Sequence, residues 1–448
     1  MELDGQMRSG APATAEGDDR PGLRPELIII VGGLIASAHA SVMITIPAMP
    51  AFMEEMGEPR IAFGLFSLDI AFTVGVILSF GIALAASSIG RVMTNIPAGL
   101  LSERIGRKQV IVAGALIIAV FGSLSGTAAN APMFWMYRFL IGIGSAMAIT
   151  VANVVATDLS TIENRGRVIG LMHGVHLIVG MSTPALGGFL AEFVDVRLPF
   201  YLSGVSIAVF AVWAAFRLPE TRPRFVHQTG GTVAPPQPRQ SAISLLRDRS
   251  FFLVCMVGFS TFFIRGGATT GLVPIFISDV LDAGPGLLGI LFTASSIIHG
   301  LIIYPAGAAA DKWGRKPIIV PAGYLVGIGI AALPFMTHTT QFIILFLVLH
   351  AVIGWGGQSP TAYLGDIAPP GMRGVSFGMY RTFGDGAGIF GPLVATALAQ
   401  LVSYEVAFGV GALLWTLTIA AFSAFALESA GPRAKHPTAL AEKALHKR

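Results

Sequence analysis

Twelve long apolar runs constrain this chain more than any other feature of its sequence. A helix needs about 20 mostly apolar residues to cross the hydrocarbon core of a membrane. Backbone amides cannot remain unpaired in lipid, so we expect every run to form a helix. The predicted spans are 27–52, 78–101, 109–128, 132–155, 166–191, 198–218, 251–277, 285–309, 317–337, 341–363, 374–401 and 404–427.

The composition agrees with a protein that is mostly embedded in lipid. Of the 448 residues, 54% are hydrophobic and 12% are charged, whereas soluble domains carry about 25% charged residues. The basic residues form short clusters between the apolar runs, and we expect no nucleic-acid partner. The single cysteine, Cys255, excludes an internal disulfide and a multi-cysteine metal site. We therefore expect no metal and no cofactor, and membrane lipids as the surroundings.

A polar interruption divides the spans into two sets of six. It covers 219–250 and is rich in Pro, Arg and Gly. We predict, in chain order, an N-terminal tail at 1–26, a six-helix bundle at 27–218, a linker at 219–250, a second six-helix bundle at 251–427 and a C-terminal tail at 428–448.

The distribution of Lys and Arg predicts the orientation. If both termini lie inside, the inner loops and tails hold 23 of the 29 Lys and Arg residues, and the outer loops hold only Arg60 and Arg197. Cytoplasmic loops of membrane proteins carry such an excess. No cleavage site follows the polar N-terminal tail, so we expect the first apolar run to be retained. The expected location is the cytoplasmic membrane, with both termini in the cytoplasm.

An internal repeat relates the two sets of spans. A shift of 208 residues places Pro97 on Pro305 and Asp158 on Asp366. Repeated membrane bundles place a substrate site at their interface, near the midplane of the membrane. The register of the repeat breaks near 58–77, where the first half carries about sixteen extra residues. This insertion is apolar enough to lie on the membrane surface, and we interpret it as a decorated loop in preference to a gate or a partner site.

The loops after the second and eighth spans carry the same pattern. They read Gly99-Leu-Leu-Ser-Glu103-Arg104-Ile-Gly106-Arg107-Lys108 and Gly307-Ala-Ala-Ala-Asp311-Lys312-Trp-Gly314-Arg315-Lys316. Both resemble the loop signature of the major facilitator superfamily, Gly-x-x-x-Asp-x-x-Gly-Arg-Lys, with a Glu in place of the usual Asp in the first loop. The fourth span carries Arg138-x-x-x-Gly142-x-Gly144, which is similar to a second signature of that superfamily.

The resemblance covers about 27–427 and implies an all-α fold. Twelve transmembrane helices would form two pseudo-symmetric six-helix bundles that move a small solute by alternating access. The resemblance further implies that the cytoplasmic loop cluster latches one conformation. The expected gating residues are Gly99, Glu103, Gly106, Arg107, Lys108, Gly307, Asp311, Gly314, Arg315, Lys316, Asp158 and Asp366.

The loop pattern also has a physical basis that is independent of the resemblance. Glycine permits tight turns and close helix approach, and an acid at the end of one helix can sit against the positive N-terminus of another. The Arg-Lys pair can bridge to acids at the ends of neighbouring spans, such as Asp158, Glu163 or Asp366. The alternative interpretation is that these basic residues only set the topology.

The fifth span contains a partial match to an antiporter signature. It reads Gly180-Met-Ser-Thr-Pro184-Ala-Leu-Gly187-Gly188 and resembles the pattern Gly-x-x-x-Gly-Pro-x-x-Gly-Gly. Val179 and Thr183 stand where the first two glycines of that pattern would be. This departure weakens a prediction of drug–proton antiport.

Ionisable residues inside the spans are the strongest indication of function, because charge is costly to bury in lipid. The candidates for the substrate and proton pathway are Arg138, Arg381, Asp385, Arg265, Arg91, His39, His173, His176, His299 and His350. They fall on spans one, two, four, five, seven, eight, ten and eleven. The resemblance implies that the other four spans are peripheral, so the charges avoid the lipid-facing helices.

Each candidate also has a purely structural explanation. Arg381 and Asp385 are one helical turn apart and can neutralise each other. Arg91 can bond backbone carbonyls, and a lone membrane histidine is more often a packing residue than a proton carrier. We expect functional roles for Arg138 and for the Arg381–Asp385 pair. The interiors of the spans contain four arginines but only one aspartate, and buried unpaired cations need compensation. We therefore expect the solute to be a small organic anion.

The chain is therefore predicted to be a secondary active transporter, coupled to protons as symporter or antiporter, that functions as a monomer. It has no Gly-rich Lys-Ser/Thr phosphate loop, no Gly-x-Ser-x-Gly elbow and no His-Glu-x-x-His helix, so we do not expect an enzyme. A drug/proton antiporter that exports lipophilic compounds is an alternative within the same class. A membrane sensor or scaffold that does not transport is an alternative of another class.

Overall fold

The computed structural model describes residues 25–58, 60–65, 68–158, 165–221, 242–357, 359–369, 372–432 and 434–435. Each predicted span is occupied by one helix or by consecutive helical elements, which confirms the all-helical fold class. By length and hydropathy alone, ten helices of the described residues can cross a membrane. Two further helices occupy predicted spans: α7 (Arg165–Phe193), with an apolar stretch at Ile178–Phe193, and α16 (Arg373–Leu401), which carries Arg381 and Asp385.

The N-terminal half runs from α1 to α8. Its elements are α1 (Pro25–Met43), α2 (Met49–Met56), β1 (Arg60–Leu65), β2 (Leu68–Thr73), α3 (Val76–Ile105), α4 (Arg107–Ser125), α5 (Ala131–Ser145), η1 (Ala146–Thr150), α6 (Val151–Asp158), α7 and α8 (Leu198–Arg217).

The C-terminal half repeats this order without the strands. Its elements are α9 (Ala242–Leu245), α10 (Arg249–Ile264), η2 (Arg265–Leu272), α11 (Val273–Asp279), α12 (Pro285–Trp313), α13 (Lys316–Ala332), η3 (Leu333–Phe335), α14 (Thr339–Gly356), α15 (Ser359–Ile367), α16 and α17 (Tyr404–Phe425).

Several predicted spans are interrupted helices. The first breaks between α1 and α2, where Pro47 and Pro50 supply no backbone donor to continue the ladder. The fourth and seventh contain the π-helical segments η1 and η2, which widen the helix locally. Such π-segments are frequent at functional sites, and η2 begins at the candidate residue Arg265.

A β-hairpin occupies the insertion near 58–77. Its two strands are antiparallel, with Arg60 opposite Thr73 and Leu65 opposite Leu68. Strand pairing gives hydrogen-bond partners to backbone N–H and C=O groups that would be unpaired in an irregular loop at a membrane surface. The side chains of 59–72 are outside the described part of the chain, so the expected position of this insertion on the membrane surface stays a prediction.

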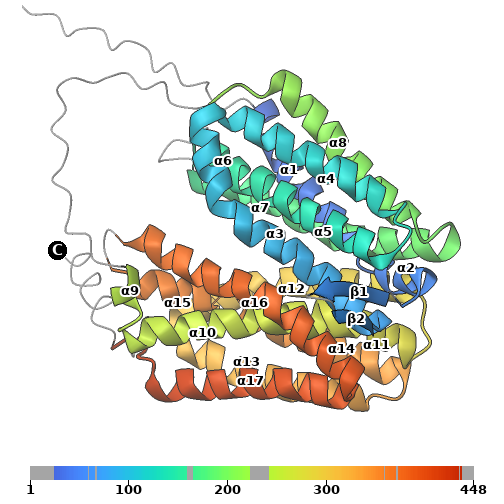
Figure 1. The fold of residues 1–448 in the computed structure, drawn as a ribbon. Coiled ribbons are helices and arrows are strands. Elements are labelled where there is room, and N and C mark those ends of the chain that lie inside the picture. Colours follow the sequence, from blue (N-terminus) through green and yellow to red (C-terminus); the bar gives the residue numbers. More distant parts are fainter. Residues whose placement is uncertain are drawn as a thin grey trace, which may run out of the picture.

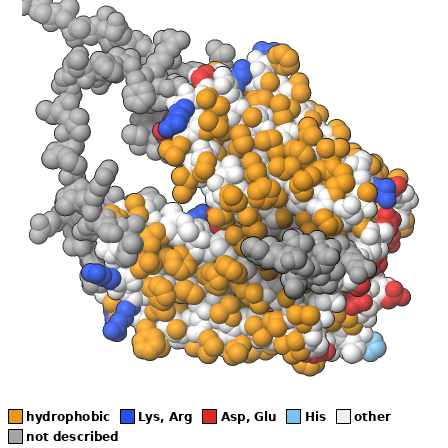
Figure 2. Space-filling model, in the orientation of Figure 1, with side chains coloured by type: hydrophobic (Ala, Val, Ile, Leu, Met, Phe, Trp, Pro, Cys, Tyr) orange, Lys and Arg blue, Asp and Glu red, His pale blue; other side chains and the backbone are white. Residues whose placement is uncertain are grey.

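The two halves pack against each other through α7 on α12 and α3 on α16. Figure 1 shows the ribbons of the halves close together beside α2, β1 and β2, and spread apart toward α6 and α9. We call these two ends the hairpin end and the motif end, because residues 99–108 and 307–316 lie at the latter. Figure 2 shows hydrophobic side chains over most of one face of both halves, as a surface in contact with lipid requires.

Close helix approach at the hairpin end depends on small residues. A Cβ on Gly188 of α7 would overlap the carbonyl oxygen of Pro285, and a Cβ on Gly289 of α12 would overlap that of Pro184. Membrane helices lack a hydrophobic driving force for association, so small residues that let backbones approach are the usual basis of tight packing. These glycines therefore allow the halves to close at this end.

Candidate functional site

The two signature loops turn at equivalent glycines at the motif end. Gly106, between α3 and α4, has φ 115°, and Gly314, between α12 and α13, has φ 109°. This backbone region is strained for a residue with a Cβ, which explains the glycine at both positions. Gly99 and Gly307 have open space around them and do not mark close helix contacts in this conformation.

A glutamate beyond the last span of each half binds the helix that follows the turn. Glu220 accepts hydrogen bonds from the backbone N–H groups of Arg107 (2.9 Å) and Lys108 (3.2 Å). Negative charge is stabilised at a helix N-terminus by the unpaired N–H groups and the helix dipole. In the N-terminal half, the carboxylate therefore fixes the signature loop against the end of α8.

The C-terminal half forms the same contact through Glu428. Its carboxylate accepts from the backbone N–H groups of Arg315 (2.9 Å) and Lys316 (3.0 Å). It also accepts from the N–H groups of Ser429 (2.9 Å) and Ala430 (3.1 Å). The sequence analysis missed both glutamates, although the repeat offset relates them.

Arg315 is the centre of an ion-pair cluster in the second loop. Its guanidinium binds Asp311 at 2.6 Å and Asp366 of α15 at 3.1 Å. Ser429 Oγ donates to the same Asp366 oxygen at 2.9 Å. Burial lowers the pKa of Arg315, but the hydrogen bonds and charges of Asp366 and Asp311 outweigh burial, and the net shift of its pKa is upward. The cluster links α12, α15 and the segment after α17.

In the first loop, the described contacts centre on Arg107. Arg107 is 9% exposed, and the charges of Glu220 and Glu103 act on it. Glu103 itself is exposed at the end of α3. Asp158 ends α6, but its side chain and the whole of Glu163 are outside the described residues, so their expected contacts with the Arg-Lys pair stay predictions.

A second set of polar residues lies where the two halves meet. Asp385 of α16 binds Arg381 Nε at 3.3 Å and accepts from Asn95 Nδ2 of α3 at 3.3 Å. Asn95 Oδ1 in turn accepts from Thr150 Oγ1 of η1 at 3.1 Å. This chain of contacts crosses from one half to the other at the one acid that we placed deep in a span. Nothing in the sequence identified Asn95 or Thr150.

Arg138 of α5 is buried without an acidic partner. It is 2% exposed, and the described residues include no carboxylate that forms an ion pair with it. Its nearest polar contact is a long hydrogen bond of 3.4 Å from Nη1 to Thr45 Oγ1, and the Phe134 ring centroid lies 6.0 Å from its Cζ. Its Nε has no hydrogen-bond partner among the described residues.

The remaining arginines lie around the same interface. Arg91 of α3 donates to Ser88 Oγ at 2.8 Å, and the charges of Asp385 and Arg381 both act on it. The charge of Arg91 in turn acts on Arg138. Arg265 of η2 is exposed and lies within the electrostatic range of Arg381. The structure therefore brings Arg381 and Asp385 into direct contact, with Arg91, Arg138 and Arg265 on the neighbouring elements α3, α5 and η2.

The candidate histidines divide into three groups. His350 Nδ1 donates to the carbonyl oxygen of Phe346 (2.9 Å), and its ring lies tilted on the Phe346 ring with the centroids 4.1 Å apart. His299 and His350 lie near Arg265 on the C-terminal side of the interface. His39 of α1 lies beside Gly180 of α7. The other two, His173 and His176, are on α7 with side chains outside the described part of the chain.

Contacts between the halves at the hairpin end include two long-range hydrogen bonds. Glu192 Oε2, at the end of α7, accepts from the backbone N–H of Gly286 at the start of α12 at 2.6 Å. Thr293 Oγ1 of α12 accepts from the N–H of Ala185 at 3.0 Å. The carboxylate of Glu192 fills the space where a Cβ on Gly286 would lie. These contacts join the halves at the end opposite the loop motifs.

Within the described residues, no group of three His, Cys, Asp or Glu side chains is placed to hold a metal ion. The interface cluster is dominated by guanidinium groups, which repel cations.

The fold and the two signature loops define a polytopic membrane protein built from two repeated helical bundles. The profile of the Major Facilitator Superfamily matches residues 31–284 and 254–447. The chain belongs to this superfamily of membrane transporters, although its subfamily is not resolved.

Relatives and solved structures agree with that assignment. "Multidrug resistance protein 2" of Bacillus subtilis (strain 168) is 23% identical over 384 residues, which are 84% of this chain and 89% of the relative. "Putative niacin/nicotinamide transporter NiaP" of the same organism is 24% identical over 75% of this chain and 83% of the relative. The crystal structure of a D-xylose-proton symporter has a TM-score of 0.67 at 17% identity and covers 90% of this chain and 98% of that one.

Proposed function

We propose that this chain is a secondary active transporter that works by alternating access, is coupled to protons and carries a small organic anion. The proposal rests on the burial of Arg138 without an ion-pair partner among the described residues. A buried guanidinium without an ion-pair partner is expensive, and removal of charge compensation inside a protein costs several kcal/mol, on the order of 3–5. An anionic solute would supply that compensation when it binds.

The surroundings of Arg138 support an anion more than a cation. Arg91, Arg265 and Arg381 contribute three further guanidinium groups near one carboxylate, Asp385. Arginine presents a planar fork of donors that matches carboxylates and phosphates. A lipophilic cation would meet net repulsion at this interface. Arg138 is the first candidate ligand of the solute, and Arg265 or Arg381 is the second.

Asp385 is the candidate proton carrier. It contacts Arg381 on its own helix and Asn95 on the opposite half, so its charge state can affect the contact between the halves. Protonation would weaken the ion pair with Arg381 and change a hydrogen bond that crosses the interface. Histidine changes charge near neutral pH, and His299 and His350 are secondary candidates because they lie near Arg265.

The orientation of the protein in the membrane determines which step of the transport cycle this conformation represents. We infer from the distribution of Lys and Arg that both termini lie in the cytoplasm, so that the hairpin end faces outward and the motif end faces inward. The halves contact each other at the hairpin end through Glu192 and Gly286, so the conformation is inward-facing. The signature loops would then act as the cytoplasmic latch that forms when the inner side closes, and the Arg315 cluster would control the rate of exchange.

A drug/proton antiporter is the second candidate function. The partial signature in α7 and the name of one Bacillus subtilis relative favour it. The glycines of that signature have a packing role, however, because Gly187 and Gly188 permit close approach to α1 and α12. Another Bacillus subtilis relative is named for niacin and nicotinamide, so the names of the relatives do not all point to drugs.

Uptake into proteoliposomes with an imposed pH gradient tests the proposed function. We expect accumulation of one or more small organic anions, which an uncoupler abolishes and which sodium does not affect. Lipophilic dye cations serve as the competing panel. Accumulation of the cations but not of any anion would replace the anion proposal with drug/proton antiport. Accumulation that survives the uncoupler would contradict proton coupling.

A further inference from the structure

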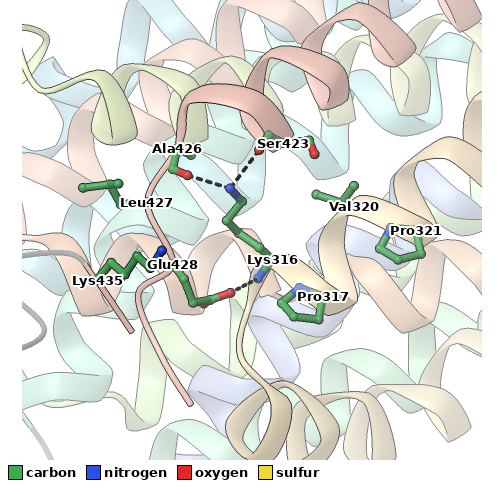
Figure 3. A pocket seen from close by; sticks show the side chains of 9 residues that line it. All are labelled: Lys316, Pro317, Val320, Pro321, Ser423, Ala426, Leu427, Glu428 and Lys435. Carbon is green, nitrogen blue, oxygen red and sulfur yellow. Dashed lines mark hydrogen bonds between the residues drawn. The ribbon is translucent and has the colours of Figure 1, made fainter. Parts of the chain in front are cut away.

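A cavity of about 520 Å³ lies between α13 and α17 at the motif end, outside the interface of the two halves (Figure 3). The first turns of α13, the end of α17 and the segment after α17 form its walls. Its lining includes Lys316, Val320, Pro321, Leu427, Glu428 and Lys435. The cavity lies outside the proposed solute pathway between the halves.

The charges of this cavity favour an anion. Lys316 Nζ is held by the carbonyl oxygens of Ser423 (2.9 Å) and Ala426 (2.6 Å) at the end of α17. Lys435 is exposed, and its backbone N–H donates to the carbonyl oxygen of Glu428 at 2.8 Å. The one acid of the lining, Glu428, is already compensated by four backbone N–H groups. Two lysines therefore line the cavity beside a single carboxylate whose oxygens already accept four hydrogen bonds.

An apolar stripe leads away from the cavity along both helices. Pro321, Leu325 and Ile328 recur at the spacing of one face of α13, and the last two are 55% and 67% exposed. On α17, Leu417 and Leu413 are 60% and 59% exposed. The site thus joins a basic, water-accessible end to exposed apolar residues on both helices. A ligand that matches both parts is amphipathic.

We propose that this cavity binds the phosphate headgroup of an anionic phospholipid, whose acyl chains lie along the stripe of α13 and α17. Basic pockets between transmembrane helices at a membrane surface are typical sites for such headgroups. Free phosphate shares the headgroup chemistry but makes no use of the stripe. The site also shares Lys316 and Glu428 with the second signature loop, so a bound lipid would stabilise the contact between that loop and the segment after α17.

Native mass spectrometry of the full-length protein tests the site. The probes are phosphatidylglycerol and phosphatidylcholine with matched chains, and inorganic phosphate. We expect Lys435→Gln to weaken binding of phosphatidylglycerol about fivefold, which is the effect of one lysine near an anionic surface. Val320→Phe, which fills the cavity without a change of charge, should weaken it as strongly. The matched controls are Lys312→Gln, outside the cavity lining, and Val348→Phe, exposed on α14; both should bind as the natural protein does.

The competing lipids and phosphate separate the possible outcomes. Preference for phosphatidylglycerol over phosphatidylcholine that both cavity variants lose supports the proposal. Equal binding of the two lipids, or the same loss in Lys312→Gln as in Lys435→Gln, overturns it. Competition by inorganic phosphate at the concentration of the lipid would show that the cavity takes a free anion, and would overturn the assignment to a lipid. None of these readouts depends on the transported solute.

Discussion

Glu220 and Glu428 occupy equivalent positions, 208 residues apart (428 − 220), and each carboxylate binds the two backbone N–H groups after a glycine with positive φ. The offset equals that of the sequence repeat. The repeat therefore includes the segment after the last span of each half as well as the membrane helices. These glutamates anchor the signature loops from outside the loops themselves.

We predict that Glu428→Gln slows transport more than it weakens solute binding. Glutamine keeps the size and one acceptor oxygen but removes a charge that stabilises the N-terminus of α13 by about 1 kcal/mol. The thermal midpoint should fall and the initial uptake rate should drop severalfold, while the Kd changes less than twofold. Glu54→Gln, exposed near the end of α2 at the hairpin end, is the matched control and should leave all three unchanged.

The parallel variant Glu220→Gln should act in the same direction in the first half. A variant of either glutamate with normal turnover but lost solute binding would show that these loops belong to the binding site and not to the latch. The two readouts, uptake rate and equilibrium binding, distinguish the possibilities in a single preparation.

We predict that Glu192→Gln loosens the closure at the hairpin end. The carboxylate accepts a 2.6 Å hydrogen bond from Gly286 across the halves, and a neutral amide makes a weaker bond at a helix N-terminus. Spin labels at Val194 and Val280, both exposed, would report the separation of the halves in a Cys255→Ser background. A larger population of long distances is expected in the variant. An unchanged distance distribution would mean that glycine packing alone holds this end closed.

We predict that Asp385→Asn uncouples transport from the pH gradient. Asparagine keeps hydrogen-bonding capacity toward Asn95 but cannot take up and release a proton. Gradient-driven accumulation should be lost, whereas exchange of labelled for unlabelled solute should continue. Asp195→Asn, in an exposed turn at the hairpin end, is the control and should retain accumulation. If Asp385→Asn still accumulates solute, the proton is carried elsewhere, and His299 and His350 are the next residues to test.

The helices could be predicted because the need to satisfy backbone hydrogen bonds in lipid acts on each apolar run separately. The π-helical segments η1 and η2 could not, since they depend on packing between neighbouring helices, whereas the break at Pro47 follows from the prolines themselves, which a count of apolar residues does not register. Arg138 and Asp385 were predictable as charges in apolar runs. Their surroundings were not, because Asn95 lies 290 residues from Asp385 in sequence and carries no charge. Glu428 could be predicted from the repeat, because the offset of 208 residues places Glu220 on it.

The central claim is that Arg138 binds an anionic solute, and the binding affinity of Arg138→Gln tests it most directly. Glutamine removes the charge but keeps a donor, so anion binding measured by calorimetry should weaken about tenfold to a hundredfold, as for a lost hydrogen bond to a charged group. Thermal stability should be unchanged or higher, because an unpaired buried charge is removed. The control Arg197→Gln, exposed at the hairpin end, should bind normally. Unchanged anion affinity in a folded Arg138→Gln protein would contradict the account.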